Sequence, residues 1–203
     1  MNRTKEEAMH TRNIAIAVAV AVVAVFAGCK VSVDKAGESG EKKVEIKTPF
    51  GGLKVNEQPD PKDVGMAIYP GAKLETKQGD KNDNANVNIE MPMFGLKVVA
   101  LKYDIEDSPD KVAAYYRQQL RSFGKVIECH GKGGDNQSIN KPEEINQPVV
   151  CEVNDPGSDV LTLKTGVRGN QHQAMIEPVG KGSKLTLLYL KAHMRGDEKK
   201  ESL

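Results

Sequence analysis

The chain has 203 residues, with 29 Lys and Arg against 28 Asp and Glu, so its formal net charge is +1. This balance argues against a nucleic-acid-binding protein, which needs a surplus of positive charge to displace counterions. The absence of Trp and the 4% aromatic content argue against a protein that stacks sugars or bases on aromatic side chains. The length fits one domain.

The chain begins with a pattern typical of an export signal. Residues 14–27 are an uncharged apolar run, and the polar segment before them carries Arg3, Lys5 and Arg12. A membrane-spanning helix needs about twenty residues, whereas a run of this length is typical of a signal-peptide core. The small residues Ala27 and Gly28 then precede Cys29, as a signal-peptidase site requires. We therefore expect residues 1–28 to be a signal peptide.

The segment Phe26-Ala27-Gly28-Cys29 resembles the lipobox of bacterial lipoproteins, with Phe26 where Leu is usual. The resemblance implies that the Cys29 thiol carries a diacylglycerol, that cleavage occurs before Cys29, and that a fatty acid such as palmitate acylates the new amine. Two or more acyl chains hold a protein stably at a membrane. In enteric-type lipoproteins, Lys30 in place of Asp favours the outer membrane. Two alternatives remain: an incidental Cys29 beside an ordinary cleavage site, and an uncleaved short anchor.

The residues after Cys29 predict a tether and then a series of strands. Residues 29–41 are polar and are expected to form a flexible tether, followed by a single α+β domain over residues 42–193. Residues 44–56 predict two strands about a Pro-Phe-Gly-Gly turn, with further strands near 72–77 and 86–91. Residues 95–103 are apolar on both faces, which is typical of a central strand. Residues 44–55 and 87–98 share seven of twelve positions, which either a duplication or common strand-turn chemistry explains.

The clearest helix is predicted at about 109–123. Ser108 is in position to cap it, Pro109 suits the first turn, and Gly124 ends it. Its apolar residues recur at the spacing of one buried face: Val112, Tyr116, Leu120 and Phe123. The fold class is therefore α+β, a mostly antiparallel sheet with one principal helix packed on it.

Cys129 and Cys151 are expected to form a disulfide, because export would place them in an oxidising compartment. They lie in residues 125–130 and 149–153, which both read as short strands. Alternation would direct both thiols to the same apolar side if these strands are neighbours. The bridge would close a long polar loop. The alternative is two buried thiols on non-adjacent strands.

The remaining elements are strands and a tail. A turn is predicted at 154–157, a strand at 160–166, and a hairpin from 171–178 and 183–192. Residues 194–203 are expected to be a disordered tail. An Ile-Tyr-Pro-Gly-Ala turn followed by an Asp-Ser-Pro helix with paired Tyr resembles small exported bacterial proteins, which supports a compact α+β domain.

No catalytic or metal-binding motif is found, and no cofactor is expected. His10, His130, His172 and His193 lack metal-ligand spacing. Asp80, Asn82 and Asn84 match only the first half of a calcium loop.

Three functions remain in order of preference. The first is a non-catalytic, lipid-anchored envelope protein that contacts another envelope protein. The alternative is a binder of small ligands that uses a sheet face and the 131–148 loop. The third is an enzyme, for which no motif argues.

Overall fold

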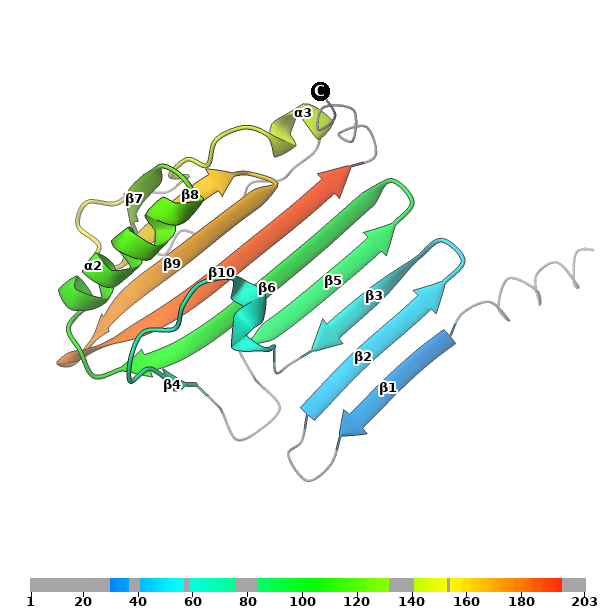
Figure 1. Cartoon of the computed structure of the whole chain (residues 1–203), viewed down its shortest axis with the longest axis horizontal. Helices are drawn as coiled ribbons and strands as arrows, with labels where there is room; N and C mark the ends of the chain where they lie inside the picture. The colour runs from blue at the N-terminus through cyan, green and yellow to red at the C-terminus, as the bar shows by residue number, and fades with distance from the viewer. Residues whose placement is uncertain are drawn as a thin grey trace, which may run out of the picture.

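The computed structural model describes residues 30–36, 41–56, 59–75, 84–131, 141–152 and 154–194. Its strands form one ten-stranded sheet in the order β1-β2-β3-β5-β6-β10-β9-β8-β7, with β4 paired to β6, and every pairing is antiparallel (Figure 1). The prediction of a mostly antiparallel sheet with one main helix is confirmed. The predicted signal peptide 1–28, Cys29 and residues 195–203 lie outside the described residues.

The segment expected to be a flexible tether contains a strand instead. Lys30–Ala36 form β1, which pairs along its whole length with β2 (Glu41–Thr48). Val31 and Val33 alternate with polar residues and pair with Ile46 and Val44, which explains the strand. The sheet therefore begins one residue after Cys29.

Two consecutive hairpins follow the expected pattern. β2 and β3 (Gly51–Asn56) flank the first turn, and β5 (Ala85–Met91) and β6 (Phe94–Ile105) flank the second. These are the two segments related by the internal sequence similarity, and they lie in tandem in the sheet. β6 lies between β5 and β10 and is the central strand that its two apolar faces predict. Of the predicted strand near 72–77, residues 76 and 77 lie outside the described residues, and the described part contains β4 at Lys73–Leu74.

The main helix lies on one side of the C-terminal half of the sheet (Figure 1). α2 spans Pro109–Leu120, and the 3-10 helix η2 (Arg121–Phe123) continues it to Gly124. The Ser108 side chain makes no capping hydrogen bond, although its carbonyl accepts the first helical bonds from Lys111 and Val112. Phe123 was expected in the buried face but is 38% exposed, because the chain leaves the α-helix at Leu120.

The core lies between α2 and the sheet. It also receives Val64 and Met66 from the 3-10 helix η1 (Pro61–Val64) and the residues after it. β8 (Leu161–Val167), β9 (Asn170–Val179) and β10 (Gly182–Met194) supply the other side together with β6. The fully buried apolar side chains of these strands are Val99, Leu101, Leu163, Ala174, Ile176, Leu185 and Leu187.

One predicted strand is wrong. Cys129 lies in β7 (Val126–His130) as expected, but the described residues around Cys151 form no strand. After the short helix α3 (Pro142–Ile145), the chain makes one isolated bridge between Pro148 and Val167 and then runs as a loop. Pro148 lacks an N–H group and cannot extend a ladder there.

The apolar side of the sheet changes from one half to the other. We call the side that carries α2 the helix face and the opposite side the open face. In β6, Val99 and Leu101 lie on the helix face and Val98 lies on the open face. Register places the apolar residues of β2, β3 and β5 on the open face. Among the described helices, α2 packs on β8, β9 and β10, η1 on β6 and β10, and α3 on β10. None of them lies over the open face of β2, β3 or β5 (Figure 1).

Candidate functional site

The open face is the most distinctive surface of the described residues. Cross-strand pairs bring its apolar side chains into one continuous band from β2 to β10, and all of them are partly exposed: Val44, Ile46, Leu53, Val55, Val87, Ile89, Leu96, Val98, Leu188 and Leu190. An antiparallel sheet normally covers its apolar side with the core. Contiguous exposed apolar surface marks a place of contact with another molecule.

The same strands present polar side chains on the helix face. Glu45 forms ion pairs with Lys47 at 2.9 Å and with Lys54 at 3.3 Å, and these contacts hold the pKa of the Glu45 carboxyl below its ordinary value. Asn86 Nδ2 donates to Asp63 at 2.9 Å, while Lys97 lies 3.8 Å from the same carboxylate. The helix face of β2, β3 and β5 is therefore polar, and only their open face is apolar. For this reason these strands do not extend the core beneath α2.

The turns at one end of the apolar band carry the most exposed apolar residues. Phe50 in the β2–β3 turn is 72% exposed, and Met91 and Met93 in the β5–β6 turn are 57% and 61% exposed. These residues are not among the functional candidates predicted from the sequence. The signal was available in the two matching segments, since both place a large apolar residue beside the turn proline.

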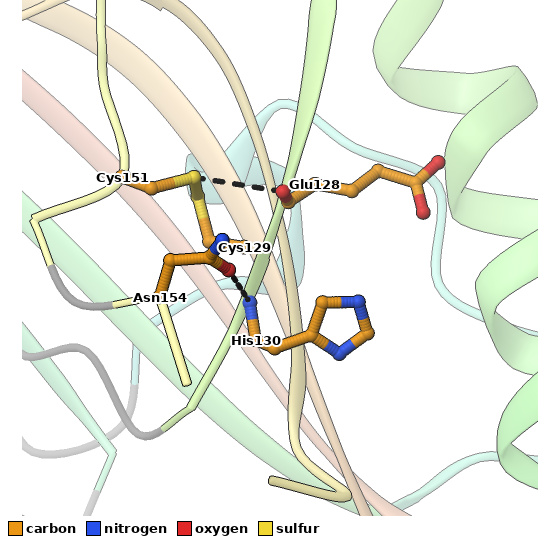
Figure 2. The surroundings of a disulfide bond; sticks show 5 residues. All are labelled: Glu128, Cys129, His130, Cys151 and Asn154. Atoms are coloured by element: carbon orange, nitrogen blue, oxygen red, sulfur yellow. Dashed lines mark hydrogen bonds between the residues drawn. A yellow bond between two sulfur atoms is a disulfide. The ribbon is translucent and has the colours of Figure 1, made fainter. Parts of the chain in front are cut away.

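Cys129 and Cys151 form the disulfide that the sequence predicts, with a Cα–Cα distance of 5.5 Å (Figure 2). The bond joins β7 to the loop after α3 rather than two neighbouring strands. Around it, the Asn154 side chain accepts a 2.9 Å hydrogen bond from the His130 amide (Figure 2). The Asp155 amide donates a further hydrogen bond to the His130 carbonyl. The bridge therefore clamps the loop onto β7 and has a structural role.

β7 is also tied to α2 by an ion pair. Arg117 donates two hydrogen bonds of 2.8 Å to the two carboxylate oxygens of Glu128. The guanidinium holds the pKa of Glu128 below its ordinary value. The pair is complete within the fold, so it offers no chemistry to a substrate.

The histidines considered as metal ligands do not converge in the structure. His130 is exposed on β7, His172 lies in β9, and His193 lies in β10 with Nε2 3.8 Å from Glu90. Among the described residues, no group of three or more His, Cys, Asp or Glu could hold a metal ion. His10 and the partial calcium loop, except Asn84, lie outside these residues. Asn84 is buried and its side chain joins the Glu75 carbonyl to the Lys102 amide.

His172 is the central ring of an aromatic stack on the helix face. Its ring lies 3.9 Å from that of Phe123 and 4.7 Å from that of Tyr189, nearly parallel to both. Burial lowers the pKa of His172 below its ordinary 6.5, so the neutral ring is favoured. Packing therefore accounts for its position.

Comparisons with protein-family models, curated proteins and solved structures found no match to this chain. None of the helices in the described part of the chain is both long and apolar enough to cross a membrane.

Proposed function

We propose that this chain is a non-catalytic, lipid-anchored protein of the bacterial cell envelope that binds another envelope protein through its open face. The predicted lipid at Cys29 supplies the membrane attachment, and in a Gram-negative envelope Lys30 after it favours the outer membrane. The observation that carries the binding role is the continuous apolar band across β2, β3, β5, β6 and β10, which no described helix covers on β2, β3 or β5.

The shape and chemistry of this band suit a protein partner. Its members are branched aliphatic side chains on a regular sheet, which offer area and no polar orienting group. Such a surface suits a second apolar face better than a small polar molecule, which needs a few placed hydrogen-bonding groups. The helix face of the same strands is polar and would remain exposed to water when a partner binds the open face.

A photo-crosslinking experiment in intact cells tests this role. A photoreactive amino acid replaces Val87 on the open face or, as the matched control, Asn88, its neighbour on the helix face. We expect the Val87 position to give one adduct of discrete mass containing the same identified envelope protein in independent cultures, and the Asn88 position to give none. Equal adduct patterns from both positions, or an adduct only with a second copy, would contradict the proposal.

Intact mass tests the anchor separately. Protein extracted from membranes should begin at Cys29 with added acyl groups, and its mass should rise by two hydrogens on reduction of the Cys129–Cys151 disulfide. An unacylated mass would remove the anchor from the proposed function.

The alternative function is the binding of a small ligand. A hollow of about 360 Å³ on the helix face is lined by lysines and asparagines from four strands, among them Lys54, Asn86, Asn88 and Lys97. This volume lies at the lower end of the range for ligand sites, and the lining suits an anionic ligand. Of the 131–148 loop first considered for this role, residues 132–140 lie outside the described residues. Thermal-shift screening with anionic metabolites, repeated on Lys97→Gln, tests this alternative; unchanged midpoints would exclude it.

A further inference from the structure

The two exposed turns lie at the same end of the sheet as the beginning of β1 (Figure 1). Lys30, the first residue of β1, pairs with Lys47, which immediately precedes the β2–β3 turn. Neighbouring strands are about 5 Å apart, and consecutive Cα atoms are about 3.8 Å apart. Lys30 directly follows Cys29 in the sequence, so the residue next to the predicted lipid attachment point lies one strand spacing from Lys47, where the turn that carries Phe50 begins.

The first turn is held in a defined conformation. The Thr48 hydroxyl donates to the Gly51 carbonyl at 3.0 Å and accepts from the Phe50 amide at 3.2 Å. Gly51 has a φ of +144° and lies so close to the Glu90 carbonyl that a side chain could not fit. The β2–β3 turn is thereby packed against the end of β5, and Phe50 projects from a fixed base.

The second turn extends the apolar surface. Met91, Pro92 and Met93 are all exposed in it, and Phe94 follows at the start of β6. Methionine is flexible and adapts to an irregular environment. Together with Phe50, these residues form two adjacent apolar protrusions, which we call the paired turns (residues 48–51 and 91–94).

A hollow on the open face lies directly behind the paired turns. It has a volume of about 400 Å³ and is lined by Ile46, Leu53 and Ile89 with Phe50 and Met91 at its margin. Thr48 supplies the one polar side chain in the lining. A polar ligand would lose its hydrogen bonds to water there without replacement, whereas the methylene groups of an acyl chain need none.

Lysines flank this apolar end. Lys30 and Lys47 are both exposed and lie one strand apart beside the first turn, where Lys47 also forms its ion pair with Glu45. Lysine side chains next to an inserted apolar segment reach the headgroup layer, where anionic lipids attract them. The predicted anchor, the two lysines and the apolar paired turns therefore lie at the same end of the sheet. This arrangement suits a protein surface that contacts a bilayer interface.

We infer that the paired turns and the hollow behind them insert into the lipid bilayer interface, as a second membrane contact beside the acyl chains on Cys29. The inference rests on the proposed function for the anchor, which brings this end of the sheet to the membrane. The strands then run away from the bilayer, with the β9–β10 turn at the far end. The part of the open face beyond the hollow, which includes Val44, Val55 and Val87, stands roughly upright above the lipid, where it remains available to an envelope protein.

Because the chain has no Trp, a single substitution supplies a specific fluorescent reporter. The full chain is produced in cells that acylate lipoproteins, checked by intact mass, and reconstituted into phosphatidylethanolamine–phosphatidylglycerol vesicles with or without brominated acyl chains. The reporters are Phe50→Trp and Met93→Trp. The matched control is Val179→Trp in the β9–β10 turn, where Val179 is 48% exposed at the opposite end of the sheet.

We expect both turn reporters to emit at shorter wavelength in vesicles and to be quenched by the brominated lipids, whereas V179W is neither shifted nor quenched. Acylated protein whose F50W and M93W fluorescence matches that of V179W would overturn the inference and leave the anchor intact. Shielding of F50W from acrylamide without quenching by brominated lipid would show a protein surface over the turn and would also overturn it. An unacylated mass would overturn the anchor and the inference together.

Discussion

Gly51 determines how the first exposed turn is presented. Its φ of +144° lies in a region that favours glycine, and its α-carbon abuts the Glu90 carbonyl of the neighbouring hairpin. The adjacent Gly52 has no such constraint, since an added methyl group would only contact the Ile46 carbonyl at 3.4 Å. Two neighbouring glycines therefore have different roles: one is needed for conformation and close approach, and the other is largely replaceable.

Gly51→Ala should therefore lower the free energy of unfolding by roughly 1–3 kcal/mol, because it adds both backbone strain and a collision. Gly52→Ala is the matched control and should change it by less than about 0.5 kcal/mol. Chemical denaturation of both variants measures the difference. Equal effects would mean that the Glu90 contact does not constrain the turn.

His172 gives the fold a pH dependence whose sign follows from burial. Since burial lowers the pKa of His172 in the folded state, the unfolded chain binds the proton more readily. Stability due to the neutral ring is therefore present above pH 6.5, the ordinary value, and is lost as the pH falls below it. The carboxyl groups of Glu128 and Asp107, whose pKa values are lowered by Arg117 and by Lys111, act at lower pH.

His172→Gln should flatten the decline in unfolding free energy between about pH 7 and pH 5, where histidines titrate. Denaturation curves at both pH values provide the measurement. A decline of wild-type size in H172Q would assign the pH dependence to other groups.

At the scale of elements, local sequence patterns predicted most of the strands and the main helix. Alternation identified the hairpins of β2–β3, β5–β6 and β9–β10, and capping and periodicity identified α2. Pairing of β1 depends on β2 as a partner, and its polar residues concealed the alternation of Val31 and Val33. The residues around Cys151 are apolar enough for a strand, but Pro148 and the disulfide hold them as a loop. The open face could not be predicted, because burial depends on where α2 packs.

α2 is fastened to the segment before β4 by a tyrosine hydroxyl. Tyr116 is fully buried, and its hydroxyl accepts from the Tyr69 amide at 3.0 Å and donates to the Ala67 carbonyl at 3.2 Å. The preceding residue, Tyr115, is partly exposed, and its hydroxyl donates one long hydrogen bond of 3.4 Å to the Ile68 carbonyl. The buried hydroxyl should therefore contribute more to stability than its neighbour.

Tyr116→Phe should cost about 1–3 kcal/mol, because it leaves two buried backbone groups without a partner. Tyr115→Phe is the matched control and should cost less than about 1 kcal/mol. Unfolding monitored by circular dichroism compares the two variants. A larger loss in Y115F would contradict this assignment of the contact between α2 and the Ala67–Tyr69 backbone.

At the scale of the whole molecule, the described strands form one continuous sheet, but the core covers only part of it. Every fully buried apolar side chain of the described strands comes from β6, β8, β9 or β10, and the described side chains of β2, β3 and β5 contribute none. One half of the sheet is therefore stabilised by α2 and the core. The other half is stabilised by strand pairing and carries an apolar band that no helix of the described residues covers. The exposed half is the one that adjoins the predicted anchor.

Local stability should follow this division. Hydrogen exchange of the detergent-solubilised full chain should give β2 and β3 amides lower opening free energies than β9 and β10 amides, because fewer buried contacts oppose their opening. In lipid vesicles, the amides near the paired turns should gain protection, while those beside the β9–β10 turn stay unchanged. Equal opening free energies for both pairs of strands in detergent would mean that the sheet unfolds as one cooperative unit, with β2 and β3 stabilised by the core through β6. A difference between the two pairs in detergent that becomes smaller in vesicles would instead show that contact with lipid stabilises β2 and β3.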